Sequence, residues 1–372
     1  ATTTHSSRFV IEMGRQVGVV LLIVLFFGLV WLDHGFKRSA LLGVVANVGL
    51  WAFGLFLAVL NGSVDLVSPT LIRDVSLGLV FLYFLSSSDS LPVSRLMAWL
   101  VLIYGALVFL LTVIVGGFEF SYPPRFYFEY SSDLVEKNVV YSQGVSKFYV
   151  FAAIAAIYLV FKESCRWLSI GLGFFTVIFL LLSLLGGARG DSVFGLFLVL
   201  CFVFSQLSGV GRFVFLGIVV VILFLAGGAV SFEDFALYER FVALDGGIGP
   251  RQILYEQAVA LLRSDGVCLT FGCGFGYFQH YYGYFAGSYP HNIFLELGIV
   301  FGVPLALLIV AASGYGVLSF LKSRVSGGGF IVLLFFYLAF IQMKSGTIVS
   351  AWLLNALAIY FVVFAISRKS SV

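Results

Sequence analysis

Two histidines and three arginines gather in one polar stretch of a largely apolar chain, and they could carry acid–base and anion-binding chemistry. The stretch spans residues 232–302, and its densest part is Ser288-Tyr-Pro-His-Asn-Ile-Phe-Leu-Glu296. An imidazole titrates near neutral pH and can accept a proton from a hydroxyl group. His291 is therefore either a general base or an interfacial hydrogen-bonding residue, and His280, amid Tyr281 and Tyr282, is a weaker candidate of the same kind.

The residues around His291 suit the start of a helix. Pro290 favours an extended conformation at the preceding Tyr289. Asn292 is expected to cap the helix that follows, and Glu296 suits its first turn. The pattern therefore predicts that His291 is held at the mouth of an apolar helix.

Arg251 is the second candidate, and it follows the sequence Gly246-Gly-Ile-Gly-Pro250. Proline is favoured at the first position of a helix, so a helix is expected to start there. Arg251 falls on the apolar face of this helix, and a cation in the first turn opposes the helix dipole. Two readings remain open: an arginine that snorkels to water, or an arginine that holds an anion such as phosphate together with the helix N-terminus. The apolar face is formed by Leu254, Tyr255, Ala258, Leu261 and Leu262.

Arg189 lies in a tight connection, Leu184-Leu-Gly-Gly-Ala-Arg-Gly-Asp-Ser192. Gly187 and Gly190 flank it and would let a ligand approach the backbone closely. Arg189 and Asp191 could equally be solvated turn residues. The functional reading gains support because this connection is expected on the same side of the membrane as Arg251.

The glycine-rich segment from Phe271 to Phe278 is predicted to be a turn that packs the chain against the helix bundle. A dinucleotide-binding loop would need a preceding strand, which the sequence does not indicate. Cys268 and Cys273 flank the segment and could pair in an oxidising compartment. Two histidines without a third nearby ligand argue against a metal site, so no metal is expected.

The composition is typical of a polytopic membrane protein. Hydrophobic residues make up 61% of the 372 residues, charged residues 10%, and the mean hydropathy is +1.09, whereas soluble domains have about 25% charged residues. A span needs about 20 mostly apolar residues. The apolar runs of the sequence predict an all-α protein of one domain over 1–372, with about eleven spans (range about 10–12). The predicted spans are 17–32, 39–60, 71–88, 94–117, 147–161, 167–185, 192–208, 212–230, 293–320, 329–344 and 347–367.

The placement of Lys and Arg predicts the topology. Successive spans place their connections alternately on the two sides of the membrane. The short connections that carry Lys and Arg fall on one of these sides, which is expected to be the cytoplasm. The two long loops, 118–146 and 232–292, then lie in the periplasm, and the second is expected to carry short amphipathic helices. The spans hold almost no ionisable residue away from their ends, which argues against an ion-coupled transporter. The net charge of +3 gives no reason to expect nucleic acid as a partner.

These motifs together resemble those of the O-antigen polymerase and O-antigen ligase superfamily. The resemblance covers roughly 184–302, from the Gly-Ala-Arg-Gly turn through the Gly-x-Gly-x-Gly turn to Pro-His-Asn-x-Phe-Leu-Glu and Gly302. It implies an inner-membrane glycosyltransferase of GT-C type fold that acts at the periplasmic face without metal or other cofactor. One departure is that Val300 and Phe301 stand where the family often has an acid.

The resemblance implies undecaprenyl-pyrophosphate-linked glycans as donor and acceptor. Such a transfer needs cations for the departing pyrophosphate and a base for the hydroxyl proton. Arg189 and Arg251 are assigned to the cations and His291 to the base. The expected substrate-binding residues are Arg240, His280, Asn292, Glu296 and Lys344.

The expected reaction is polymerisation of repeat units into O-antigen or a related polysaccharide, with membrane lipids and a chain-length regulator protein as partners. The alternative is a ligase that transfers the glycan to lipid A-core, and a polysaccharide transporter or flippase ranks third. The loop 232–292 holds six acids against three arginines. Such a surface disfavours a phosphate-rich acceptor, so polymerase is preferred.

Overall fold

The structure is a computed structural model, and it describes most of the chain. The described residues are 38–67, 70–87, 90–115, 117–119, 125–132, 135–141, 143–185, 189–217, 250–285, 288–323 and 328–369. The predicted span at 17–32, most of that at 212–230, and Arg240 lie outside these residues.

Helices account for most of the described chain, as the sequence predicted. Four of them are long and apolar enough to cross a membrane: Ser39–Leu60, Ser94–Ile114, Arg166–Leu185 and Val303–Lys322. Four shorter apolar helices cover Val145–Val160, Gly190–Gln206, Gly329–Ser345 and Trp352–Arg368. These helices are compatible with a membrane protein, and the count of about eleven spans stays a prediction.

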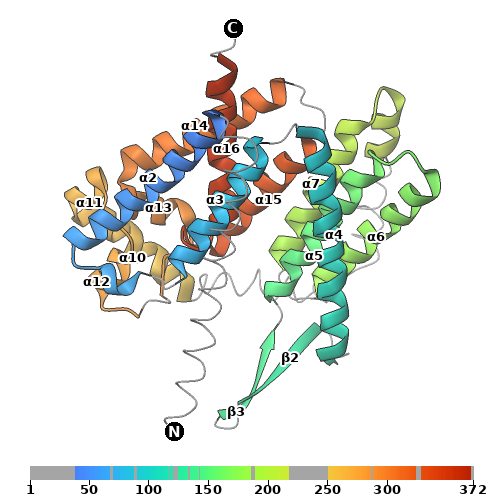
Figure 1. Cartoon of the computed structure of the whole chain (residues 1–372). Helices are drawn as coiled ribbons and strands as arrows, with labels where there is room; N and C mark the ends of the chain where they lie inside the picture. Colours follow the sequence, from blue (N-terminus) through green and yellow to red (C-terminus); the bar gives the residue numbers. More distant parts are fainter. Residues whose placement is uncertain are drawn as a thin grey trace, which may run out of the picture. The chain divides into compact units, whose positions relative to one another are not determined.

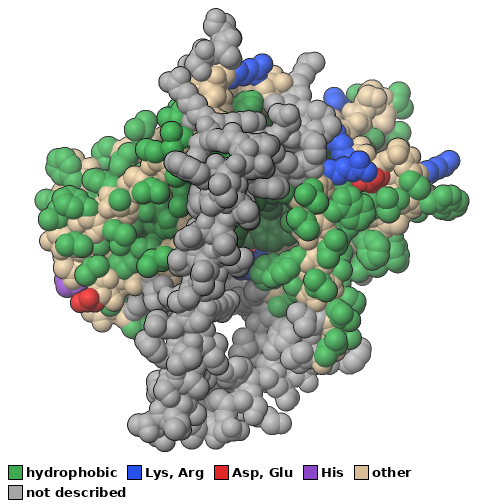
Figure 2. All heavy atoms as spheres, in the orientation of Figure 1, with side chains coloured by type: hydrophobic (Ala, Val, Ile, Leu, Met, Phe, Trp, Pro, Cys, Tyr) green, Lys and Arg blue, Asp and Glu red, His purple; other side chains and the backbone are tan. Residues whose placement is uncertain are grey.

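The surface of these helices is apolar. Large hydrophobic side chains are strongly exposed along them, for example Ile114 at 68% and Leu308 at 63%. Figure 2 shows hydrophobic side chains over most of the described surface in view, with few charged ones. Soluble proteins rarely expose apolar surface so continuously, whereas lipid-facing helices do.

The described chain forms two compact units. The first contains the described residues within 1–90, 250–325 and 338–372, and the second contains those within 91–249 and 326–337. The helix α15 (Gly329–Ser345) contributes residues to both.

The second unit consists of closely packed helices and a small sheet. Its helices are α4 (Ser90–Val115), α5 (Gln143–Val160), α6 (Arg166–Leu185) and α7 (Arg189–Gln206). Small residues bring them together: a Cβ added to Gly105 of α4 would lie 2.4 Å from Ala152 of α5, and one added to Gly195 of α7 would lie 2.3 Å from Val150. This is the small-residue packing expected between helices in a membrane.

The loop predicted at 118–146 contains an antiparallel sheet that the sequence analysis did not foresee. Its strands β1 (Gly117–Glu119), β2 (Arg125–Ser132) and β3 (Val135–Tyr141) pair in the order β1-β2-β3. Figure 1 shows the hairpin of β2 and β3 extending past the ends of α4 and α5. The aromatic and β-branched residues of this segment favour strands, so a local signal was present.

The first unit is built on α16 (Trp352–Lys369). The helices α2 (Arg38–Leu60), α3 (Leu71–Ser87) and α14 (Val303–Lys322) all pack against it (Figure 1). The short helices η1 (Val64–Leu66), α10 (Pro250–Ser264), α11 (Gly266–Phe271), α12 (Tyr277–Tyr282) and α13 (Ile293–Phe301) complete this unit.

The prediction of one continuous span at 293–320 is wrong. The helix breaks at Gly302, whose φ is +80°, so that α13 and α14 are separate elements. A Cβ at this position would lie 2.5 Å from the carbonyl oxygen of Thr270, so the break is enforced by a close backbone approach as well as by φ. The last helix, predicted from 347, starts at Trp352 because residues 346–351 form a turn.

The glycine-rich segment packs against the bundle, as predicted. Gly272, Gly274 and Gly276 all have positive φ values, between +74° and +84°. The N–H groups of Cys273 and Gly274 donate hydrogen bonds to carbonyl groups of α13, at 2.8 and 3.1 Å. The segment is thereby held against the C-terminal end of α13.

On its other side the same segment contacts α2. The N–H of Phe275 donates to the carbonyl oxygen of Gly54 at 3.3 Å, and Asn61 Nδ2 donates to the carbonyl oxygen of Cys273 at 3.2 Å. The Phe275 ring is buried and stacks on Trp51 with centroids 5.2 Å apart. Cys268 and Cys273 form a disulfide, which closes the turn at its start.

Candidate functional site

The helix α10 starts at Pro250 and has the apolar face that the sequence predicted. Ala258 and Leu261 are fully buried in a cluster with Phe278 of α12 and Ile299 of α13. The opposite face is exposed, and Gln252 and Glu256 hydrogen-bond there at 2.9 Å. The packing fixes the direction of α10 and therefore the position of Arg251 in its first turn.

His291 has an unusual backbone conformation. Its φ is +54°, the one positive φ at a non-glycine residue among those the structure describes. It follows the buried Pro290, and its ring packs on that of Tyr289 with centroids 4.1 Å apart. Such a conformation costs about 1–3 kcal/mol and persists where the surroundings impose it. The His291 ring is thus held in place rather than free to rotate into water.

Hydrogen bonds from two tyrosines join three segments around His291. The Tyr255 hydroxyl of α10 donates to the carbonyl oxygens of His291, at 3.4 Å, and Lys344, at 3.2 Å. The Tyr289 hydroxyl donates to the carbonyl oxygen of Ser345 at 3.4 Å. The last turn of α15, where Lys344 lies, is thereby brought to the site.

Arg251 and His291 influence each other electrostatically, so the structure brings these two predicted residues together. Burial lowers the pKa of His291, and the positive charge of Arg251 lowers that pKa further. Both effects favour a neutral imidazole at neutral pH. The Nδ1 atom of His291 is buried and has no hydrogen-bond partner among the described atoms.

Tyr289 lies in the same electrostatic environment. Burial raises the pKa of its hydroxyl, the carboxylate of Glu296 raises it further, and the charge of Arg251 opposes the rise. The Tyr289 hydroxyl therefore stays protonated and can donate a hydrogen bond at any physiological pH.

Asn292 and Glu296 fix the start of α13. Asn292 Oδ1 accepts from the N–H groups of Phe294 and Leu295 at 2.9 and 3.2 Å, which confirms the predicted cap. Glu296 Oε2 accepts from the N–H of Ile348 at 2.8 Å and ties α13 to the turn before α16. Burial raises the pKa of Glu296 to about 8, although the Ile348 hydrogen bond opposes this. Its carboxyl group is therefore largely protonated at neutral pH.

A polar cavity of about 200 Å³ opens beside Tyr289 and Glu296. Its wall carries the hydroxyl and amide groups that suit a neutral, hydroxyl-rich ligand, and Tyr289 and Phe275 add aromatic surface. The polar residues that line it are Thr70, Gln279, Tyr289, Glu296, Thr347 and Ser350. We call this cavity the polar pocket.

The sequence analysis missed Tyr289, Gln279, Thr70 and Thr347 as site residues. Tyr289 adjoins His291 in the sequence, so that adjacency was a usable signal. Thr70 and Thr347 come from segments far from His291 along the chain, and no local pattern distinguishes them from other threonines.

The other predicted site residues are not brought to His291 by what the structure describes. Arg189 starts α7 in the second unit, and only its backbone is described. His280 is exposed on α12, with its ring 6.3 Å from that of Tyr277. Arg240 lies outside the described residues. The roles assigned to these three residues stay predictions.

One cluster of metal-binding residue types occurs among the described residues. Ligand atoms of Asp265, Cys268 and Cys273 lie within 4.8 Å of one another. The disulfide occupies both sulfur atoms, and Asp265 Oδ1 caps α11 by accepting from Val267 and Cys268 at 3.0 Å. These groups are thus engaged in holding the turn that precedes Phe275.

Comparison with known proteins adds no assignment. Neither a protein-family model nor a curated protein sequence matches this chain. A function can therefore be argued only from the geometry around His291 and from the resemblance of the motifs.

Proposed function

We propose that this protein is an inner-membrane glycosyltransferase that polymerises undecaprenyl-pyrophosphate-linked repeat units into O-antigen or a related polysaccharide. The reaction would take place at the periplasmic face. The observation that carries the proposal is a backbone-strained His291 whose pKa is lowered by burial and by the charge of Arg251. A base beside a cation is the pair that glycosyl transfer from a lipid pyrophosphate requires.

The proposed step is a displacement at the anomeric carbon of the donor. A hydroxyl oxygen of the acceptor sugar forms the new C–O bond, and the bond from the anomeric carbon to the pyrophosphate oxygen breaks. His291 accepts the hydroxyl proton, which its neutral state permits. Undecaprenyl pyrophosphate leaves with the bonding electrons, and Arg251 stabilises its negative charge.

The polar pocket supports the assignment of a sugar as ligand. Its wall offers neutral donors and acceptors together with a protonated Glu296. A site for a charged acceptor would be expected to show fixed charges of opposite sign. We therefore place the acceptor sugar in this pocket, with its reacting hydroxyl toward His291.

A deletion strain tests the proposal against its alternatives. Loss of a polymerase should leave single repeat units attached to lipid A-core. Loss of a ligase should leave bare lipid A-core while long chains accumulate on undecaprenyl pyrophosphate. Loss of a flippase should leave repeat units on the cytoplasmic side and no polymer. Either of the last two patterns would overturn the proposed polymerase.

A further inference from the structure

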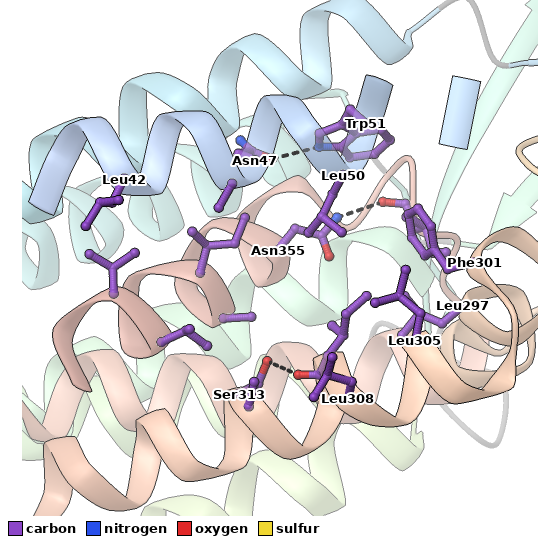
Figure 3. A pocket seen from close by; sticks show the side chains of 18 of the residues that line it. Leu42, Asn47, Leu50, Trp51, Leu297, Phe301, Leu305, Leu308, Ser313 and Asn355 are labelled. Atoms are coloured by element: carbon purple, nitrogen blue, oxygen red, sulfur yellow. Dashed lines mark hydrogen bonds between the residues drawn. The ribbon is translucent and has the colours of Figure 1, made fainter. Parts of the chain in front are cut away.

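An apolar slot runs along the membrane helices of the first unit. The helices α2 and α14 each pack on α16, and a cavity of about 390 Å³ lies between them. One water molecule occupies about 30 Å³ in the liquid, so the slot is far larger than a packing defect. Figure 3 shows Leu42 at one end and Leu297 and Phe301 at the other.

The side chains that line the slot do not favour a polar ligand. It carries no ionisable side chain. Its polar side chains already bond within the protein: Asn47 accepts from Trp51 at 2.8 Å, Asn355 donates to Ile348 at 3.1 Å, and Ser313 donates to Ile309 at 2.7 Å (Figure 3). A hydrocarbon is therefore the ligand class that the slot suits.

The shape of the slot suits one long chain. Its lining extends along α16 from Asn355 to Ile366, which is roughly 16 Å at a rise of ~1.5 Å per residue. Leu42, Leu308 and Ile366 line it and are 42%, 63% and 55% exposed, so the slot opens to the lipid-facing surface of the helices. A chain can thus enter sideways from the bilayer.

The slot adjoins the candidate site. Phe275 lines both the slot and the polar pocket. Ile348 lines the slot, while its N–H donates to Glu296 in the wall of the polar pocket. An amphiphile with its chain in the slot therefore has its polar head beside the candidate site.

We propose that the slot between α2, α14 and α16 binds the polyprenyl chain of the lipid-linked substrate next to its head group. This rests on the proposed function for the nature of the head group. Leu297 and Phe301 contact the chain at the end of the slot next to the candidate site, and α14 and α2 hold its first isoprene units. The rest of the chain extends into the bilayer past Leu308.

Photocrosslinking at two neighbouring positions tests the proposal. Leu308 lines the slot, whereas Leu307 is equally exposed on α14, at 64%, and does not line it. Benzoylphenylalanine is placed at each position in turn, in phospholipid vesicles that contain a small mole fraction of long-chain polyprenyl phosphate. Mass spectrometry then identifies the crosslinked lipid.

The position 308 adduct should be enriched in polyprenyl phosphate several-fold over its fraction in the vesicles, and the position 307 adduct should match the vesicle composition. Bulk composition at both positions would overturn the proposal, and so would a phospholipid selectively enriched at position 308. Ala312→Phe, which narrows the slot, should abolish the enrichment, whereas Ala311→Phe, one residue away and outside the lining, should preserve it.

This measurement needs no turnover, so it separates the slot from the proposed reaction. If polyprenyl phosphate is enriched at position 308 but the protein polymerises nothing, the slot proposal stands and the polymerase proposal is rejected. If the protein polymerises repeat units without that enrichment, the polymerase proposal stands and the slot proposal is rejected. Thermal unfolding of each variant, compared with the wild type, excludes misfolding as the cause of a lost adduct.

Discussion

Glycine allows close helix packing in both compact units, and in the first it also interrupts regular structure next to the candidate site. In the second unit, Gly105 and Gly195 lie inside helices and let α4 and α7 approach α5 closely, and Gly316 does the same between α14 and α16 in the first unit. In the first unit, Gly272, Gly274 and Gly302 also adopt positive φ and interrupt regular structure. The first unit thereby gains the turns that place Phe275 and present α13 to the site.

The two units also differ in where the polar contacts compared below lie. In the second unit the described ion pair of Arg95 with Glu163 lies at the end of α4, where the Arg95 side chain is 54% exposed. In the first unit Glu296 and Tyr289 are partly buried beside a pocket and bond to backbone across elements. Candidate chemistry is therefore expected where helices break, and regular helix packing alone gives no site.

Replacing a glycine in each unit should give the largest contrast. A Cβ at Gly274 would lie 2.2 Å from the backbone nitrogen of Ala58, and its φ is +84°. Gly274→Ala should therefore lose most of the folded protein in fluorescence-detected gel filtration. Gly171→Ala in α6, where nothing lies within 4 Å, should change stability by no more than about 1 kcal/mol. Similar thermal stability of the two variants would contradict the close backbone contact at Gly274.

Arg251 gives the next largest effect. Arg251→Lys keeps the charge but loses the planar fork that binds phosphate through two hydrogen bonds. Loss of a charge-assisted hydrogen bond of ~1.5–3 kcal/mol should lower polymerisation on the order of 10–100-fold. Arg263→Lys, an exposed change in the last turn of the same helix, should leave the rate unchanged. A wild-type polymerisation rate for Arg251→Lys would show that Arg251 acts only through its positive charge and not through two parallel hydrogen bonds.

Glu296 gives a smaller, pH-dependent effect. Its pKa is raised from 4.5 to about 8, so the folded state favours the protonated form. That stabilisation is complete below the ordinary value and is lost as pH rises through about 8. Glu296→Gln can still accept the Ile348 hydrogen bond and does not ionise.

The wild-type Tm should therefore fall relative to that of Glu296→Gln as pH increases over this window. Glu256→Gln, an exposed change on α10, serves as the control and should leave the wild-type pH dependence intact. A difference between wild type and Glu296→Gln that stays constant with pH would show that Glu296 is ionised throughout.

Features set by short-range rules could be predicted from the sequence. The start of α10 at Pro250, its buried face and the Asn292 cap each depend on residues within a few positions. The packing turn of the glycine-rich segment is likewise local, whereas the sequence left the pairing of Cys268 with Cys273 open. These elements placed Arg251 and His291 correctly at the starts of two neighbouring helices.

Features set by contacts between distant segments were not predicted. The break at Gly302 depends on the approach of Thr270, and the Tyr255 hydroxyl reaches a carbonyl group 89 positions away. Similarly, Glu296 suited the first turn of a helix, but nothing local indicated that it would bond to Ile348. The polar pocket and the apolar slot arise from such contacts, so sequence patterns alone could not delineate them.

Purified protein in vesicles with lipid-linked repeat units tests most directly whether His291 is the base in a polymerisation reaction. His291→Ala should lower the initial rate about 10²–10⁴-fold, while Arg263→Ala, an exposed change in the last turn of α10, should match the wild type. The wild-type rate should rise as pH increases through the lowered pKa of His291, and the residual rate of His291→Ala should not follow that rise. A folded His291→Ala protein that polymerises at the wild-type rate would contradict the account.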